Sequence, residues 1–164
     1  MQNSCDIVVV GAGAAGCVLA ARLSEDASRR VILIEAGADT PPGAVPDDIL
    51  DTFPSSYFNP SYFWPGLQAA VYADAAPVPY QQPRVMGGGS SVMGMWALRG
   101  LPGDYDAWRE IGAVGWGWDD VLPSFKRLER SIDYDGPEHG RDGPIPLRRF
   151  APETWPGIVR ALAQ

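Results

Sequence analysis

The sequence predicts an α/β fold that is built on one parallel β-α-β unit. Residues 6–10 (DIVVV) and 31–34 (VILI) are short apolar runs rich in β-branched residues, a pattern typical of strands buried on both faces of a parallel sheet. Residues 14–26 (AAGCVLAARLSED) lie between these runs and carry apolar residues at helical spacing. Strand, helix and strand within about 30 residues form a right-handed β-α-β unit with parallel strands.

Composition restricts the classes of function. The chain has 164 residues, in the size range of one domain, and a formal net charge of −7. This charge argues against a protein that binds nucleic acid or an anionic membrane, because such proteins usually carry a basic patch. No apolar stretch approaches the ~20 residues of a membrane span. Cys5 and Cys17 are too few for a disulfide framework. No charged segment precedes the first apolar run, so we expect no signal peptide and a cytoplasmic location.

Residues 41–83 differ in character from the sequence on either side. They contain nine of the sixteen prolines and eight of the seventeen aromatic residues, with four acidic residues and no Lys or Arg. So many prolines exclude a long helix or a central strand, yet the aromatic content is too high for a solvated linker. We expect an extended segment that packs on a larger surface, either as a cover for the core or as a lid beside a ligand site.

Regular patterns return in the second half of the chain. Residues 84–98 contain a glycine-rich loop and a short apolar run, and residues 104–111 and 118–131 have helical patterns. In the second of these patterns acidic residues come first and basic residues last, which suits the helix dipole. A strand is expected at 145–148 and a further helix at 155–164.

The first chemical motif is Gly11-Ala-Gly13-Ala-Ala-Gly16, which follows a predicted strand and opens a predicted helix. In this context it indicates a dinucleotide-binding turn. Gly11 permits the tight turn, Gly13 lets the backbone approach a pyrophosphate, and Gly16 lets helix and strand pack closely. The helix N-terminus then faces the phosphates. Glu35 ends the second strand, where its carboxylate can accept hydrogen bonds from both ribose hydroxyls and would repel a 2′-phosphate. The motif favours an ADP-containing dinucleotide over NADP and does not distinguish FAD from NAD.

The second motif is a glycine-rich loop, RVMGGGSS at residues 84–91. Its glycines can expose backbone N–H groups to a ligand, and Ser90 or Ser91 can cap a following helix. Taken alone, the loop fits an ordinary turn with a helix cap as well as it fits a ligand loop. A second loop of this type favours a flavin, because nicotinamide dehydrogenases usually need only the first.

Four stretches of the chain resemble the N-terminal part of the glucose–methanol–choline (GMC) family of flavoprotein oxidoreductases. They are DIVVVGAGAAGCVLAARLSED with VILIEAG, RVMGGGSSV with the following Arg99-Gly100, DYDAW at 104–108 with GWGWDDVLPSFKRLE at 115–129, and HGRDGPIPL at 139–147. They occur in the family's order and span nearly the whole chain. Within the family, FWP at 63–65 and the stretch RGLPGDYDAW are most like bacterial oxidases of furanic or aromatic primary alcohols.

The resemblance implies a Rossmann-like FAD-binding fold that is incomplete without the rest of a longer enzyme. It divides the chain into a β-α-β unit (1–40), a covering or lid segment (41–83), a second flavin loop with a helix (84–100) and the helical start of a substrate-side region (101–164). The first glycine motif would hold the pyrophosphate and Glu35 the adenine ribose, while the second loop would run toward the isoalloxazine. The residues that would contact FAD are Gly11, Gly13, Ala14, Ala15, Gly16, Glu35, Ala36, Arg84, Met86, Gly87, Gly88, Ser90, Ser91, Val92, Met93 and Gly94.

The chain departs from the family pattern at three positions. In some members a His at the position of Val92 bonds covalently to the flavin, and Val cannot, so we expect FAD to bind non-covalently. The family has Asn where Met93 stands, so any contact of an amide side chain is lost there. Pro83 replaces a small residue before Arg84. These changes indicate altered flavin affinity or substrate preference, or a weakened paralogue.

The activity that the resemblance implies is FAD-dependent oxidation of a primary alcohol to an aldehyde, with hydride passing to flavin N5. The family's catalytic base is a His near the C-terminus of the enzyme. The single histidine here, His139, lies in the HGRDGP loop and not at that position. We therefore expect no catalytic residue and no metal site in this chain, and we expect the chain by itself to be inactive.

Three alternatives stay open at this point. The chain can be part of an NAD-dependent dehydrogenase, part of a non-redox flavoprotein of the lyase or decarboxylase type on the same scaffold, or an isolated binding module. The partners expected for the main interpretation are a small-molecule alcohol and the remainder of the enzyme, as a C-terminal part or a second chain.

Overall fold

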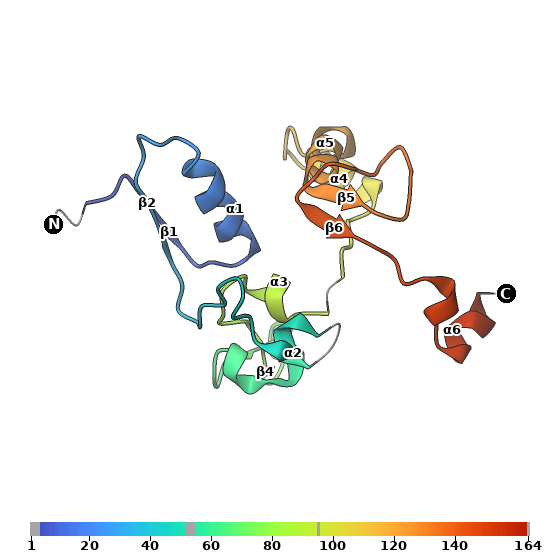
Figure 1. Cartoon of the computed structure of the whole chain (residues 1–164), viewed down its shortest axis with the longest axis horizontal. Coiled ribbons are helices and arrows are strands. Elements are labelled where there is room, and N and C mark those ends of the chain that lie inside the picture. The colour runs from blue at the N-terminus through green and yellow to red at the C-terminus, as the bar shows by residue number, and fades with distance from the viewer. Residues whose placement is uncertain (1–3, 52–54, 95, 164) are drawn as a thin grey trace. The chain divides into compact units, whose positions relative to one another are not determined.

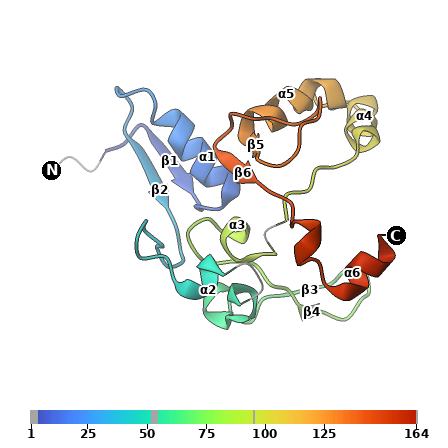
Figure 2. The ribbon, with the colours of Figure 1, turned by 45° about the vertical axis from the view of Figure 1, so that its right-hand side comes forward.

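The predicted β-α-β unit is present at the start of the chain. The computed structural model describes residues 4–51, 55–94 and 96–163. In it, β1 (Ile7–Val10) and β2 (Val31–Ile34) pair in parallel along their whole length. Helix α1 (Ala14–Leu23) joins them and lies beside the pair, as both Figure 1 and Figure 2 show. The helix ends before the predicted residue 26, at Ser24, whose hydroxyl donates a hydrogen bond to the Ala21 carbonyl (3.0 Å).

Residue contacts divide the chain into two compact units, Met1–Trp96 and Ala97–Gln164, which we call unit 1 and unit 2. Unit 1 contains the β-α-β unit, the covering segment and the second glycine-rich loop. Unit 2 contains the later helices and a short sheet. No helix in the described part of either unit is long and apolar enough to cross a membrane.

The covering segment contains only short elements among its described residues, as its prolines predict. They are α2 (Asp47–Leu50), two single 3₁₀ turns at Ser56–Phe58 and Pro60–Tyr62, and the antiparallel pair of β3 (Gln68–Ala69) and β4 (Val78–Pro79). The rest of the described segment consists of turns, bends and irregular chain.

The core of unit 1 lies between the covering segment and the second glycine-rich loop. Tyr62 and Phe63 from the segment pack with Val85 and Val92, which flank the loop on either side. Val85 and Val92 are completely buried. The aromatic residues of the covering segment therefore pack on the loop, and they fix it in place by burial.

Unit 2 begins with two helices that have acidic residues in their first turns. In α4 (Pro102–Glu110) the Leu101 N–H donates to the Asp104 carboxylate (2.8 Å). In α5 (Trp118–Leu128) the Gly117 N–H donates in the same way to Asp120 (3.0 Å). These bonds satisfy N–H groups that a helix start leaves without partners.

The helix predicted at 118–131 is too long, because its last three residues form a strand. β5 (Glu129–Ser131) pairs in parallel with β6 (Ile145–Leu147), which confirms most of the strand predicted at 145–148. The Ser131 N–H donates to the Gly140 carbonyl (2.8 Å), and the Glu129 carbonyl accepts from Gly143 (3.0 Å). These partners draw the backbone out of the helix. The last helix, α6 (Gly157–Leu162), lies within the predicted range.

Candidate functional site

The first glycine turn has the close contacts that its sequence motif predicts. Gly11 has a φ of +92°. Gly16 is buried, and a Cβ atom at this position would overlap the Gly11 carbonyl oxygen. No residue larger than glycine fits there without a shift of the backbone. The start of α1 therefore packs directly on the turn that follows β1.

The N-terminus of α1 is open to a ligand. Its first backbone bond runs from the Cys17 N–H to the Gly13 carbonyl (2.9 Å), so the N–H groups of Ala14 and Ala15 have no partner within the helix. Both alanines are exposed, and a Cβ atom on Gly13 would meet nothing within 4 Å. This end of the helix carries a partial positive charge and suits an anion.

The second glycine-rich loop lies between the first turn and the segment that follows β2. The Gly87 N–H donates to the Ala12 carbonyl (2.7 Å), and the Met86 N–H donates to the Ala38 carbonyl (2.9 Å). Parallel bridges join Gly13 to Gly87 and Ala38 to Val85. Backbone hydrogen bonds thus join two loops that are far apart in the sequence.

Gly88 is the point of closest approach between the loops. Its φ is +57°, and a Cβ atom on it would lie 2.9 Å from the Cα atom of Gly13. A side chain at position 88 would therefore push the two loops apart. This close contact explains why position 88 of the second loop requires glycine.

Glu35 braces both segments that flank the second loop. Its Oε2 atom accepts a hydrogen bond from the Ala12 N–H (2.7 Å), and its Oε1 atom accepts one from the Gly37 N–H (2.8 Å). No motif in the sequence predicts these two backbone hydrogen bonds of Glu35. Each carboxylate oxygen has a further lone pair, so the ribose contact assigned to Glu35 is compatible with the structure and stays a prediction.

Two expectations about the second loop are wrong. Ser90 and Ser91 do not cap the helix, because they lie inside α3 (Gly89–Val92), where their hydroxyls donate to the carbonyls of Gly87 (2.6 Å) and Met86 (2.8 Å). The N–H groups of Gly87 and Gly88 do not face a ligand either. They donate to Ala12 and to Val85 (2.8 Å), since the loop folds as a tight turn against the first one.

The remaining predicted contact residues differ in exposure. Ala36 is exposed, and Met93, at the end of α3, is 38% exposed. Gly94 is partly buried, whereas Val92 is completely buried in the core of unit 1. The side chain of Met93 is therefore accessible to a ligand or to another segment beside the loop, whereas the side chain of Val92 is not. The cofactor contacts at these positions stay predictions.

Arg84 is a partly buried cation whose charge is not paired with any described carboxylate. Its Nε atom is buried and has no hydrogen-bond partner in the described part of the chain. The carbon of its guanidinium lies 5.5 Å from the centroid of the Trp64 ring, and no described acidic side chain forms an ion pair with it. A buried polar group without a partner is costly, so this arrangement points to an anionic ligand.

A hydrogen-bond network in the covering segment holds the 3₁₀ turn at Pro60–Tyr62, which contacts the backbone of Arg84. The Tyr62 hydroxyl and the Asn59 amide donate to the Asp48 carboxylate (both 2.8 Å). These two bonds, that of Asn59 first, lower the pKa of Asp48. Burial, followed by the Asp48 carboxylate, raises the pKa of Tyr62 to about 12. The Tyr62 carbonyl in turn accepts a hydrogen bond from the Arg84 backbone N–H (2.6 Å).

Together these features fit a cofactor with a pyrophosphate. Open backbone at Gly13, N–H groups without helical partners at the start of α1 and an Arg84 guanidinium without a described carboxylate partner supply space, donors and positive charge. The donors belong to backbone and guanidinium groups, which suit phosphate oxygens.

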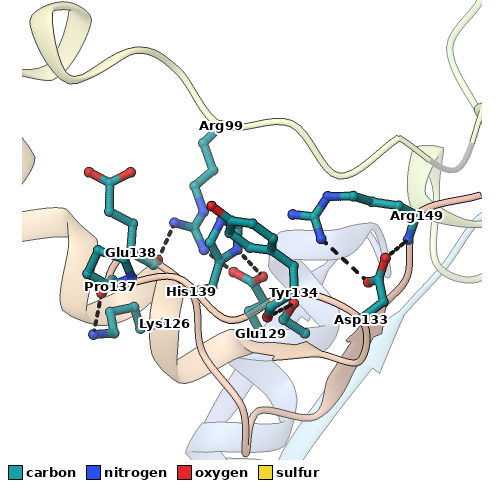
Figure 3. Close-up of polar contacts among 10 residues, drawn as sticks. Arg99, Lys126, Glu129, Asp133, Tyr134, Pro137, Glu138, His139 and Arg149 are labelled. Carbon is teal, nitrogen blue, oxygen red and sulfur yellow. Dashed lines mark hydrogen bonds and ion pairs between the residues drawn. The ribbon is translucent and has the colours of Figure 1, made fainter. Parts of the chain in front are cut away.

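Unit 2 contains a polar cluster of a different kind. Figure 3 shows the Glu129 carboxylate between Arg99 and His139: it forms an ion pair with Arg99, and its Oε1 atom lies 2.6 Å from the Nδ1 atom of His139. Arg99 also donates to the Glu138 carbonyl (2.8 Å). Glu129 is only 4% exposed. The cluster satisfies its own charges, and His139 serves in it as a structural partner of Glu129.

Three known proteins illustrate what the chain is similar to. It is 45% identical to the 5-(hydroxymethyl)furfural oxidase of Methylovorus sp. (strain MP688), over 97% of this chain and 32% of that protein. It matches the crystal structure of pyridoxine 4-oxidase from Mesorbium loti with a TM-score of 0.76 and 37% identity, over 96% of this chain and 31% of the other. It also matches an FAD-dependent oxidoreductase from Chaetomium thermophilum with a TM-score of 0.73 and 35% identity, over 87% and 26%.

The family match covers both units of the chain. The family model for GMC oxidoreductases matches residues 5–157, which include both glycine loops and the polar cluster of unit 2. The chain spans less than a third of the length of the curated relatives described, at 32% of the oxidase from Methylovorus. The chain belongs to the GMC oxidoreductase family and corresponds to its N-terminal, FAD-binding region.

Proposed function

We propose that this chain supplies the FAD-binding part of an enzyme that oxidises a primary alcohol to an aldehyde. The observation that carries the proposal is the joining of the two glycine loops at Gly13 and Gly87, in a unit where Arg84 forms no ion pair with a described acidic side chain. A single dinucleotide turn would serve a nicotinamide cofactor equally well. The second loop, held against the first by backbone bonds, supplies the longer site that a flavin cofactor needs.

Each part of the site has a binding role in this proposal. The N-terminus of α1 and the Arg84 guanidinium bind the phosphates, while Glu35 accepts hydrogen bonds from the ribose and keeps both flanking segments in place. Bound FAD supplies the hydride acceptor. Val92 offers no side chain for covalent attachment, so the cofactor is held by non-covalent contacts alone.

The substrate class follows from the similar proteins. The relative from Methylovorus is an oxidase of 5-(hydroxymethyl)furfural, a molecule with a primary alcohol on a furan ring, and the solved neighbour is a pyridoxine 4-oxidase. These names support a small primary alcohol carried by an aromatic ring.

The remainder of the enzyme is the partner that the proposal requires. Val8, Val10, Ile32 and Ile34 alternate along β1 and β2 and are between 41% and 80% exposed. Parallel sheets are normally covered on both faces. We infer that further parts of the enzyme cover this apolar face and supply the base that deprotonates the alcohol.

The proposal is tested on the complete purified enzyme. We expect an equimolar flavin absorbance and a flavin that denaturation releases into solution. Under anaerobic conditions, hydroxymethylfurfural should bleach the flavin, whereas the methyl ether of the same compound should not. A colourless protein that binds NADH would refute the FAD assignment. A yellow protein whose flavin is reduced by no primary alcohol would instead support a non-redox member of the family.

A further inference from the structure

Trp64 and Arg84 are brought together by a short antiparallel pairing between the covering segment and the approach to the second loop. The Trp64 N–H donates to the Gln82 carbonyl (3.0 Å), and a bridge joins Phe63 to Pro83. The backbone N–H of Arg84 donates to the Tyr62 carbonyl (2.6 Å). In such a pair, diagonal neighbours lie within reach of aromatic and long side chains. The pairing therefore places the indole of Trp64 under the Arg84 guanidinium.

An aromatic partner holds a cation in a way that a carboxylate cannot. A carboxylate would cancel the charge of Arg84 and occupy its N–H donors. The face of an indole attracts the guanidinium through its quadrupole and leaves both charge and donors available. Trp64 is 45% exposed, so burial of a large side chain in the core does not explain its position. The stack orients Arg84 and keeps it able to bind an anion.

We propose that Trp64 is a positioning residue for FAD, which holds the Arg84 guanidinium in place for the cofactor's phosphates. The proposal rests on the proposed function, because it assigns the anion beside Arg84 to FAD. It adds a role for the covering segment, which then contributes to cofactor affinity through Trp64 besides burying the core. No described acidic side chain pairs with Arg84 in competition with the phosphates.

The test measures the affinity of the complete apoenzyme for FAD by titration with flavin fluorescence. Trp64→Leu should raise the dissociation constant about 5- to 30-fold, since a partly desolvated cation–π contact is lost. Trp64→Tyr keeps an aromatic face and should stay within about 3-fold of wild type. Trp108→Leu is the matched control. Trp108 is 48% exposed and has no cation over its ring among the described residues, so this variant should bind FAD as wild type does.

A double-mutant cycle shows whether Trp64 acts through Arg84. On an Arg84→Met background, Trp64→Leu should change the dissociation constant less than about 2-fold, because the group that it positions is absent. An undiminished effect on that background would overturn the proposal, and so would wild-type affinity in Trp64→Leu itself. If urea unfolding shows that the apo form of Trp64→Leu is not folded, the cycle is run with Trp64→Met, which also lacks an aromatic face, with the same criterion for coupling. A wild-type enzyme that binds no FAD would refute the proposed function, whereas FAD binding without coupling would refute only the role of Trp64.

Discussion

Arg84 in unit 1 and Arg99 in unit 2 both lie over an aromatic ring, but among the described residues only Arg99 also has a carboxylate partner. The guanidinium carbon of each lies over an aromatic ring, 5.5 Å from the centroid of Trp64 for Arg84 and 5.3 Å from that of Phe125 for Arg99. Arg99 forms an ion pair with the buried Glu129. Arg84 has no such pair in the described part of the chain. The contrast separates a cation that stabilises the fold from one that is available to a ligand.

Removing the counter-ion of Arg99 should have the largest effect on stability. Glu129→Gln leaves Arg99 without its charged partner, and breaking a buried ion pair in this way costs about 3 kcal/mol or more. We expect a loss of that size in urea unfolding of the apoenzyme, with the affinity for FAD unchanged. Glu25→Gln serves as the control, because Glu25 pairs with Arg22 in an exposed position and should change the stability by less than about 0.5 kcal/mol. Equal effects of the two variants would remove the distinction between a buried and an exposed pair.

Arg84→Met should show the opposite pattern. The loss of charge-assisted hydrogen bonds to phosphate should weaken FAD binding about 10- to 100-fold. The stability of the apoenzyme should fall little, because the contact with Trp64 is lost while a buried Nε atom without a described hydrogen-bond partner is removed. Arg99→Met is the matched comparison, and it should destabilise the apoenzyme while leaving FAD affinity close to wild type. If Arg84→Met destabilised the apoenzyme as strongly as Arg99→Met, the two arginines would have the same role.

Two glycine variants should likewise separate a position that the fold requires from a position that FAD binding requires. Gly88→Ala places a methyl group against Gly13 at a positive φ and should destabilise the apoenzyme by about 1–3 kcal/mol. Gly13→Ala has open space around its Cβ and an ordinary φ of −71°, so it should preserve the fold and weaken FAD binding. Thermal unfolding and flavin titration of both variants check this, and a Gly13→Ala enzyme with unchanged FAD affinity would count against the proposed phosphate position.

The smallest effect is expected for the hydrogen bonds to Asp48 that hold the 3₁₀ turn beside Arg84. Tyr62→Phe removes one of two hydrogen bonds to Asp48 and should cost about 1 kcal/mol at pH 7. The lowered pKa of Asp48 means that its ionised form contributes stability above its ordinary pKa of 3.8, and that this contribution is lost as the pH falls further. The difference between wild type and variant should therefore shrink below pH 3.8 in urea unfolding curves. A difference that is the same at pH 7 and pH 3 would contradict this role of Asp48.

Local patterns in the sequence predicted the elements whose partners lie nearby. The two strands, their helix and the two glycine loops follow from short apolar runs and from the spacing of Gly11, Gly13 and Gly16. The strand at Glu129–Ser131 was missed because its partners, Gly140 and β6, come later in the chain. A helical pattern at 118–131 carries no information about them.

The site was predicted in part, for the same reason. Gly88 and Arg84 were identified from their motif, but the contact of Gly88 with Gly13 depends on a tertiary pairing. The two backbone bonds of Glu35 and the position of Trp64 under Arg84 also arise only when distant segments meet. The motif FWP indicated a kind of relative, and it carried no physical signal of a cation–π contact.

We propose that FAD supplies the counter-ion that Arg84 lacks among the described residues. The most direct test is an experimental structure of the complete enzyme with FAD bound. In that structure we expect an Arg84 guanidinium nitrogen about 3 Å from a phosphate oxygen of FAD, with the guanidinium still stacked on Trp64. A carboxylate from another part of the enzyme, paired with Arg84 in that structure, would contradict it.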